Sequence, residues 1–255
     1  MRAIRYLNPI YKFTKRLVKY FLRKFNYSIN ISKHPIKDAF DLAALNKNEN
    51  CTFIDIGANI GQGILLFDSL VKKANLGKVK VFGFEPIEEN FNKLKENTSI
   101  VSSSLDIFKL GISDTDGFFD LYHSKSNLCH SINNSDVWKS RKAKKETIEL
   151  KQLDTVIPCE KISGKIIIKI DVEGHEMEVL SGMKDFLNSK NTKILILEVG
   201  FNPEDKGHTH FCKIETFLFK YGFRCCNILN INTFSHPDWD NKLSIGFADA
   251  LFIKN

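Results

Sequence analysis

Short apolar runs that alternate with helix-like stretches constrain the fold of this chain more than any other feature. From residue 51 onward the runs are rich in Val, Ile and Phe, and most are followed by a stretch with helical character. Such runs suit strands that are buried on both faces of a parallel sheet, with helices as crossovers. The pattern therefore predicts an α/β fold with a Rossmann-like, doubly wound, mostly parallel sheet. The expected strands are residues 51–56, 79–84, 105–110, 165–170, 194–199 and 247–253, and the expected helices are residues 62–73, 87–97, 173–188 and 211–221.

Residues 117–150 interrupt this alternation and are interpreted as an insert. Their ends, 117–122 and 146–150, resemble strands, whereas the middle is rich in Ser and Asn and then in basic residues. Because ligands bind at the carboxyl ends of the strands in open α/β sheets, an excursion above those ends could contact substrate. The alternative is a solvated loop without a role in binding.

The N-terminal segment carries the excess positive charge of the chain. Residues 1–37 include ten Lys or Arg and no Asp or Glu, whereas the remainder has 27 bases and 30 acids. Between residues 9 and 25, apolar and basic side chains fall on opposite arcs at ~100° per residue, which predicts a basic amphipathic helix. This helix could lie on an anionic membrane surface, or its apolar arc could pack on the body of the protein or on a second subunit. We divide the chain into a basic arm, residues 1–38, and a domain, residues 39–255.

The composition of the domain also limits its partners. Its near-neutral to acidic balance argues against a nucleic-acid partner. No apolar run approaches the ~18 residues that a membrane span needs. The six cysteines include no C-x-x-C pair, which argues against structural zinc and favours a reduced compartment. We expect a cytoplasmic protein that can also contact the membrane surface through residues 9–25.

A glycine-containing loop follows the first expected strand. It reads D-I-G-A-N-I-G over residues 55–61. Gly57 allows a sharp turn, Gly61 allows close approach of backbone to a ligand or to the sheet, and Asn59 tolerates left-handed geometry. Because position 59 is not glycine, the loop departs from the G-x-G-x-x-G dinucleotide motif. An ordinary strand-to-helix turn is the alternative interpretation.

An acid ends the second expected strand. Glu85 precedes Pro86 and a helix-like stretch. A carboxylate at this position can accept hydrogen bonds from both ribose hydroxyls of an adenosine. The alternative is an acid placed near a helix start, where the helix dipole favours it. Because Glu85 occurs together with the preceding loop, we favour a role for it in binding a nucleoside.

A third polar cluster closes the fourth expected strand, K-I-D-V-E-G-H-E over residues 169–176. Asp171 and Glu173 are expected near the reactive end of a cofactor, where either could orient a substrate hydroxyl or act as a base. His175 is the side chain that titrates near neutral pH. Alternatively, Asp171 caps the following helix and His175 lies on its outer face.

Two histidines after the fifth expected strand raise the question of a metal. His208 and His210 could join Asp171, Glu173 or Glu198 as ligands. Because alternating histidines on exposed loops more often bind nothing, we predict no metal site, although a divalent metal is compatible with the sequence.

Five ordered blocks resemble the FkbM-type S-adenosylmethionine (SAM)-dependent methyltransferases. They are D-I-G-A-N-I-G, F-E-P-x-x-x-N-F-x-x-L, G-I-S-D-x-x-G, I-K-I-D-V-E-G-H-E and L-E-V, and they run from about residue 51 to residue 200. The resemblance implies a class I methyltransferase fold with SAM lying across the strand ends. It also implies a cofactor site that includes Glu85 at the ribose and the backbone near Gly111 and Ile112 beside the adenine. Asp106 lies on the third strand, where adenine-side contacts are common, but no motif supports it. The loop residues that the resemblance assigns to the cofactor are Asp55, Gly57, Asn59 and Gly61.

The expected reaction is methylation of a hydroxyl on a carbohydrate, a glycolipid or a related small molecule, with Asp171, Glu173 and His175 as catalytic candidates. Many members of the family that the chain resembles methylate such hydroxyls. Two other classes stay open at this point. One is a nucleic-acid methyltransferase, although the [D/N]-P-P-[Y/F/W] turn of adenine N-methyltransferases is replaced by Asp-Val-Glu-Gly at residues 171–174. The other is a non-catalytic, membrane-associated module with the same fold.

Overall fold

The computed structural model describes residues 34–123, 130–131, 144–202, 207–235 and 243–254. The amphipathic helix predicted for residues 9–25 lies outside them. None of the helices in the described ranges has the length and apolar character needed to cross a membrane.

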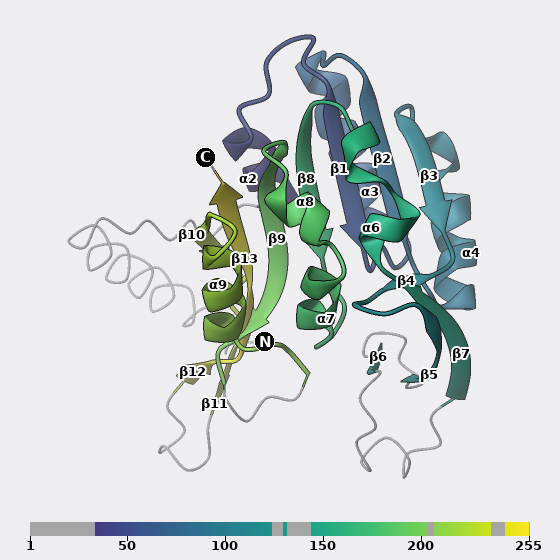
Figure 1. Cartoon of the computed structure of the whole chain (residues 1–255), viewed down its shortest axis with the longest axis vertical. Coiled ribbons are helices and arrows are strands. Elements are labelled where there is room, and N and C mark those ends of the chain that lie inside the picture. The colour runs from purple at the N-terminus through teal and green to yellow at the C-terminus, as the bar shows by residue number, and fades with distance from the viewer. Residues whose placement is uncertain (1–33, 124–129, 132–143, 203–206, 236–242, 255) are drawn as a thin grey trace, which may run out of the picture.

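A seven-stranded sheet forms the centre of the described chain (Figure 1). Its strand order is β10-β13-β9-β8-β1-β2-β3, and β13 runs antiparallel to both of its neighbours while the other strands run parallel. From β1 the chain moves outward to β2 and β3, and it later returns to place β8 and β9 on the other side of β1. The predicted doubly wound, mostly parallel sheet is confirmed, and its switch point lies between β1 and β8. The strands are β1 (Cys51–Ile56), β2 (Val79–Phe84), β3 (Ser104–Phe108), β8 (Lys165–Ile170), β9 (Thr192–Gly200), β10 (Phe223–Leu229) and β13 (Phe247–Lys254).

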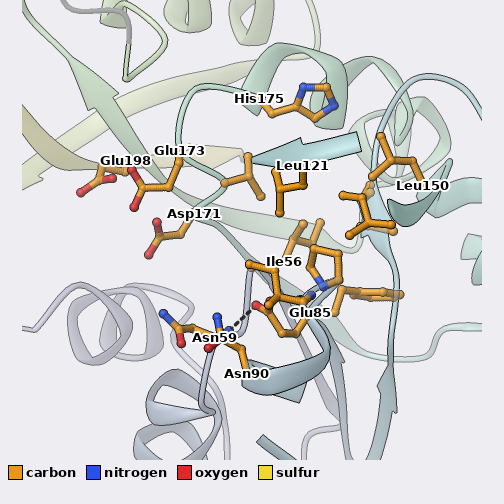
Figure 2. A pocket seen from close by; sticks show the side chains of 18 residues that line it. Ile56, Asn59, Glu85, Asn90, Leu121, Leu150, Asp171, Glu173, His175 and Glu198 are labelled. Atoms are coloured by element: carbon orange, nitrogen blue, oxygen red, sulfur yellow. Dashed lines mark hydrogen bonds between the residues drawn. The ribbon is translucent and has the colours of Figure 1, made fainter. Parts of the chain in front are cut away.

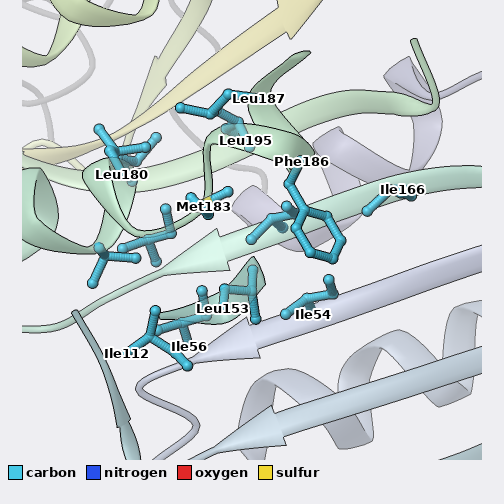
Figure 3. Close-up of a cluster of buried hydrophobic side chains, with 14 of the residues drawn as sticks. Ile54, Ile56, Ile112, Leu153, Ile166, Leu180, Met183, Phe186, Leu187 and Leu195 are labelled. Atoms are coloured by element: carbon cyan, nitrogen blue, oxygen red, sulfur yellow. The ribbon is translucent and has the colours of Figure 1, made fainter. Parts of the chain in front are cut away.

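Helices cover both faces of this sheet. Successive residues of β1 point to opposite faces, so that Phe53 packs in one apolar cluster and Ile54 in the other. One cluster includes side chains of α2, α3 and α4, and the other includes those of α6, α7, α8 and α9 (Figures 1 and 3). The helices are α2 (Pro35–Leu42), α3 (Gln62–Ala74), α4 (Glu88–Asn97), α6 (Leu153–Val156), α7 (Glu176–Ser181), α8 (Lys184–Asn188) and α9 (Phe211–Phe219), with short 3₁₀ turns η1 (Thr98–Ile100) and η2 (Cys159–Lys161).

The single helix predicted for residues 173–188 is wrong. The chain forms α7 and α8 instead, separated at Gly182. A Cβ atom at Gly182 would lie 1.8 Å from the carbonyl oxygen of Ser113, so only glycine fits this break. The helix also begins later than predicted, because Glu173 (φ 53°) and Gly174 (φ 94°) have left-handed backbone conformations. The third strand likewise ends at residue 108 rather than 110.

A second, smaller sheet lies at the carboxyl ends of the main strands (Figure 1). Its order is β4-β7-β5-β6, and β5 pairs antiparallel with residues 144–150 of β7 along its full length. The strand-like ends predicted for the insert therefore form the two long strands of this sheet. Its strands are β4 (Gly111–Ile112), β5 (Gly117–His123), β6 (His130–Ser131) and β7 (Lys144–Lys151), and a separate hairpin is made by β11 (Thr233–Ser235) and β12 (Leu243–Ile245).

Candidate active site at the carboxyl ends of the strands

The loop after β1 is held tightly against the neighbouring strand ends. The backbone N–H groups of Gly57 and Ala58 donate to the carbonyl of Phe84, at 3.0 and 2.9 Å. Gly57 has φ 80°, and a Cβ atom there would lie 1.9 Å from the carbonyl oxygen of Asp171. Asn59 has φ 50°, as its tolerance of left-handed geometry predicts. The loop therefore presents backbone, rather than side chains, between β1 and β8.

Gly61 has a packing role in the structure. It precedes α3 with φ 90°, and a Cβ atom there would lie 2.8 Å from Thr98 Cγ2 and 2.9 Å from Leu94 Cδ1. Gly61 thus allows the start of α3 to approach the end of α4. It does not line the cavity described below.

Glu85 is fixed by backbone donors on both of its carboxylate oxygens. The N–H of Asn59 donates to one oxygen at 2.9 Å, and the N–H of Ile87 donates to the other at 3.0 Å. The residue is only 4% exposed. Burial raises the pKa of Glu85 to about 7, although these donors and Asn90 act in the opposite direction. The helix α4 begins three residues later, so Glu85 connects two loops rather than capping a helix.

A cavity of about 260 Å³ lies beside Glu85 (Figure 2). Its floor comes from the ends of β1, β2, β8 and β9, and its apolar wall comes from the small sheet. Gly111 and Ile112 line it. Asp106 does not: it is half exposed, pairs with Lys80 at 2.6 Å and lies beside a different cavity. The lining residues are Ile56, Gly57, Asn59, Phe84, Glu85, Pro86, Ile87, Asn90, Gly111, Ile112, Leu121, Ile148, Leu150, Asp171, Val172, Glu173, His175 and Glu198.

Acidic side chains gather on one side of this cavity. In Figure 2, Asp171, Glu173 and Glu198 lie together, across from Leu121 and Leu150. Burial raises the pKa of Glu173 to about 7, and the nearby carboxylates of Glu198 and Asp171 act in the same direction. Like charges at this spacing disfavour the ionised form.

A lysine with a side chain only 16% exposed joins two of the neighbouring carboxylates. Lys169 Nζ lies 2.8 Å from Asp171 Oδ2 and 3.6 Å from Asp55 Oδ1. Burial alone would lower the pKa of Lys169, but Asp171 and Asp55 raise it overall, so the ammonium stays charged. Burial raises the pKa of Asp55 to about 6, against the effect of Lys169. Because the carboxylate of Asp171 pairs with Lys169 and α7 begins at Glu176, Asp171 does not cap this helix.

A second cavity, of about 500 Å³, shares the lining residues Gly57, Asn59, Asn90, Asp171 and Glu198 with the first. It lies on the other side of the loop after β1 and reaches the start of α2 at His34. Asp55, which does not line the first cavity, lines this one together with Lys169 and Asp249. Asp55 Oδ1 is buried without a hydrogen-bond partner among the described residues.

His175 lines the first cavity but is held by a structural contact. Its Nε2 atom lies 2.9 Å from Ser113 Oγ, and Ser113 is 2% exposed. Burial lowers the pKa of His175, although Glu178 and Asp114 oppose the change. The histidine thus connects the start of α7 to the segment that follows β4. Of the three catalytic candidates, it has the clearest alternative role.

The two histidines after β9 have different positions. His208 Nε2 lies 3.3 Å from Glu198 Oε2, and ligand atoms of Glu173, Glu198 and His208 all lie within 4.8 Å of one another. His210 precedes α9, and its Nδ1 accepts from the N–H of Cys212. The structure therefore separates two residues that the sequence pattern had grouped together.

Several cavity residues were missed as candidates. Asn90 belongs to the second motif block, so its spacing could have drawn attention to it. Leu121, Ile148 and Leu150 could have been found from alternation along the strands of the insert. Lys169 carried no sequence signal that would pair it with Asp55, which lies 114 positions earlier in the chain.

The strand order, the loop after β1 and the buried acid at the end of β2 define a Rossmann-like domain with a ligand cavity at its switch point. Comparison with known proteins then identifies the family. The methyltransferase FkbM domain matches residues 55–225, and the chain therefore belongs to the FkbM methyltransferase family. Its fold is the class I fold of SAM-dependent methyltransferases.

Two curated relatives and one solved structure illustrate these similarities. Hexuronic acid methyltransferase AglP of Haloferax volcanii is 27% identical over 66% of this chain, and methyltransferase sdnD of Sordaria araneosa is 29% identical over 57%. The matches span 65% and 64% of the length of these relatives. The crystal structure of TehB from Haemophilus influenzae aligns with a TM-score of 0.44 and 14% identity, over 93% of this chain and 66% of that one.

Proposed function

We propose that this protein transfers a methyl group from SAM to a hydroxyl of a carbohydrate, a glycolipid or a related small molecule. One observation carries the proposal: a single cavity joins Glu85 and an apolar wall to the carboxylates of Asp171 and Glu173, in a chain of the FkbM methyltransferase family. Glu85 and the apolar wall suit a nucleoside. The carboxylates of Asp171 and Glu173 suit the place where an acceptor hydroxyl reacts.

The residues present fit the cofactor. Gly57 keeps the loop after β1 free of side chains that would enter the space between β1 and β8. Glu85 accepts backbone hydrogen bonds on both oxygens and retains lone pairs for two ribose hydroxyls. Asp55 lines the neighbouring cavity rather than this one, and its Oδ1 lies 3.6 Å from Lys169 Nζ. The apolar side chains that could contact an adenine are Ile112, Leu121, Ile148 and Leu150.

SAM supplies an electrophilic methyl group on a positively charged sulfur. In the transfer, an O–CH₃ bond forms at the acceptor, the S–CH₃ bond breaks, and the hydroxyl proton must leave to a base. Asp171 and Glu173 line the cavity where they can orient the hydroxyl and accept its proton. His175 faces the same cavity, but its contact with Ser113 gives it a positioning role in this proposal.

The acceptor class is inferred from two sources. AglP is a hexuronic acid methyltransferase by name, and it supports a carbohydrate acceptor. The acidic side of the cavity argues against a polyanionic acceptor such as nucleic acid. Neither a nucleic-acid methyltransferase nor a non-catalytic, membrane-associated module has support among the relatives.

Two measurements test the proposal. Calorimetry should detect SAM binding by the full chain, and Glu85→Ala should weaken it by ~1.5–3 kcal/mol because hydrogen bonds to an ionised carboxylate are lost. Incubation with labelled SAM and fractionated cell-envelope extract should then place label in a carbohydrate or glycolipid fraction. Tight binding of NAD in place of SAM, or label only in nucleic acid, would overturn the assignment.

We also propose that residues 9–25 bring the protein to anionic membrane surfaces. The proposal rests on the separation of apolar and basic residues in that sequence. Co-sedimentation with anionic vesicles should be strong for the full chain and weak for a chain lacking residues 1–30. Equal sedimentation of both would refute it.

A further inference from the structure

We infer that Glu173, Glu198 and His208 form a binding site for a divalent cation. This site goes beyond the sequence expectation, which placed no metal here. Only its role in holding the acceptor rests on the proposed function, because cation binding itself requires neither SAM nor acceptor.

The three side chains have the spacing of a ligand set. An octahedral cation with bonds of ~2.1 Å places neighbouring ligand atoms ~3.0 Å apart and opposite ones ~4.2 Å apart. His208 Nε2 and Glu198 Oε2 are 3.3 Å apart, close to the neighbouring spacing. All three ligand atoms lie within 4.8 Å of one another, so small side-chain rotations would complete the set. Two carboxylates with one imidazole suit divalent ions such as Mn²⁺, Fe²⁺ or Zn²⁺.

The local charge balance favours a cation. Glu173 and Glu198 converge, and in the described part of the chain neither forms an ion pair with a lysine or arginine. The nearest buried ammonium, on Lys169, pairs with Asp171 and Asp55 instead. The side chains of Glu198 and His208 are 20% and 13% exposed, so water screens the charges at this site only partly.

The three ligands come from different segments of the chain. Glu173 follows β8 with φ 53°, a conformation that costs a residue with a side chain some free energy. Glu198 lies on β9 and is held by the sheet ladder. The ring of His208 stacks on Phe247, with centroids 4.3 Å apart and planes 13° apart.

The loop that carries His208 is also anchored beneath the site. The hydroxyl of Thr209 donates to Glu176 Oε2 at 2.6 Å, and Glu176 is fully buried. The N–H of Gly200 donates to the carbonyl of Thr209 at 2.9 Å. The three ligands therefore come from three segments that the fold fixes relative to one another.

The position of the site indicates how the cation would act on the acceptor. Glu173 and Glu198 line the cavity in which the acceptor would react. Three protein ligands leave coordination positions open, and two hydroxyls of a sugar could occupy them. The cation would orient the acceptor oxygen and make its proton easier to lose to a nearby carboxylate.

The test measures Mn²⁺ binding to the full chain after removal of metals with a chelator, in the absence of SAM and acceptor. Electron paramagnetic resonance of free Mn²⁺ should show one bound ion per chain. Glu173→Gln, Glu198→Gln and His208→Ala should each weaken binding about tenfold or more. Circular dichroism confirms folding of each variant, and three independent variants keep the test valid if one fails to fold.

Two substitutions are matched controls. Glu178→Gln removes a carboxylate from the neighbouring helix α7, and His210→Asn removes the second histidine of the loop while keeping an acceptor at the start of α9. Both should retain Mn²⁺ affinity. No stoichiometric Mn²⁺ binding, or binding that the three ligand variants leave unchanged, would overturn the site.

The outcomes also separate this inference from the proposed function. Mn²⁺ binding without methyl transfer to any carbohydrate fraction would remove the function and leave the cation site. Methyl transfer by a protein that shows no stoichiometric Mn²⁺ binding would do the reverse, leaving the function and removing the cation site.

Discussion

At the scale of single residues, Glu85 combines two demands that oppose each other. In the proposed cofactor site its carboxylate must be ionised to accept hydrogen bonds from two ribose hydroxyls, yet burial raises its pKa to about 7. Protonation removes one acceptor and one negative charge. Cofactor binding should therefore depend on pH near neutrality.

We expect SAM affinity to rise as pH increases from about 6 to 8 and then to level off. Below the pKa of Glu85 the affinity should fall by up to about tenfold per pH unit, because a proton must leave before the cofactor binds. Calorimetry between pH 5.5 and 8.5 measures this directly. Glu85→Gln should bind more weakly with a flatter profile, whereas Asp106→Asn, outside the cavity, should keep the wild-type profile. A wild-type profile that is flat through pH 7 would contradict the role of Glu85.

Gly57 offers a second test at this scale. Gly57→Ala places a Cβ atom 1.9 Å from the carbonyl oxygen of Asp171 at φ 80°, so the backbone must shift. We expect a loss of ~1–3 kcal/mol or more in the free energy of unfolding, measured with urea, together with weaker SAM binding. Gly117→Ala is the control, since its closest neighbour is the flexible ring of Phe119 at 3.2 Å. Equal effects of the two substitutions would show that the close approach is unimportant.

The residues of the cavity differ in how well sequence predicts them. Glu85 and Gly57 were identified because each follows directly on a buried strand, and strand ends meet at one edge of a parallel sheet. The cluster of Glu173, Glu198 and His208 was considered only among other combinations, because its members come from three segments. Which side chains converge depends on backbone details, such as φ 53° at Glu173, that no periodic pattern encodes.

At the scale of elements, the small sheet covers the cavity with one face only. Along β5, Leu121 is 4% exposed and lines the cavity, whereas Phe118 is 75% exposed on the other face. Together with Ile87, Ile148 and Leu150, Leu121 forms a small apolar cluster. The strands β5 and β7 of the insert therefore form one wall of the site.

Leu121→Ala and Phe118→Ala form a matched pair on this strand. Leu121→Ala removes apolar contact where an adenine would lie, and we expect SAM affinity to fall by ~1–2 kcal/mol. Phe118→Ala should leave affinity unchanged, because its ring points away from the cavity. Calorimetry at one pH measures the SAM affinity of both variants. Similar losses of SAM affinity in the two would mean that the small sheet affects binding through the overall stability of the protein.

Elements were predictable where the apolar pattern was strong. The bounds of β1, β2 and β8 agree with the expected strands because β1 is buried throughout and most residues of β2 and β8 are buried as well. The strand β10 was missed because only its ends are buried, so the sequence FRCCNIL lacks a clear period. The helix break at Gly182 was missed because it arises from contact with Ser113, far away in the sequence.

At the scale of the whole molecule, buried carboxyl groups set the pH dependence of stability. Burial raises the pKa values of Asp55 and Glu85 to about 6 and about 7, above those of the unfolded chain. The folded chain therefore binds more protons between about pH 4 and 7, and its stability falls as pH rises through this range. Asp68 acts at lower pH: despite burial, hydrogen bonds from Lys72 and Ser103 hold its pKa at about 2, so its contribution is lost only below about pH 4.

We expect the cofactor-free protein to melt at a higher temperature near pH 5 than at pH 8. Each of the two raised carboxyls accounts for at most about 3 kcal/mol of the difference. Differential scanning calorimetry of the full chain without SAM measures it. Asp55→Asn combined with Glu85→Gln should reduce the difference, and a wild-type protein that is most stable at pH 8 would contradict the argument.

The position of β13 has a consequence for how the molecule forms. This strand is the last along the described chain, yet it lies between β9 and β10 rather than at an edge. During synthesis, β9 must therefore present an unpaired, apolar edge until residues 247–254 have been made, and β10 has no partner in this sheet before then. Exposed edges of this kind recruit other chains. We therefore expect insertion of β13 between β9 and β10 to be a late step of folding, and we expect the nascent chain to be prone to aggregation before that step.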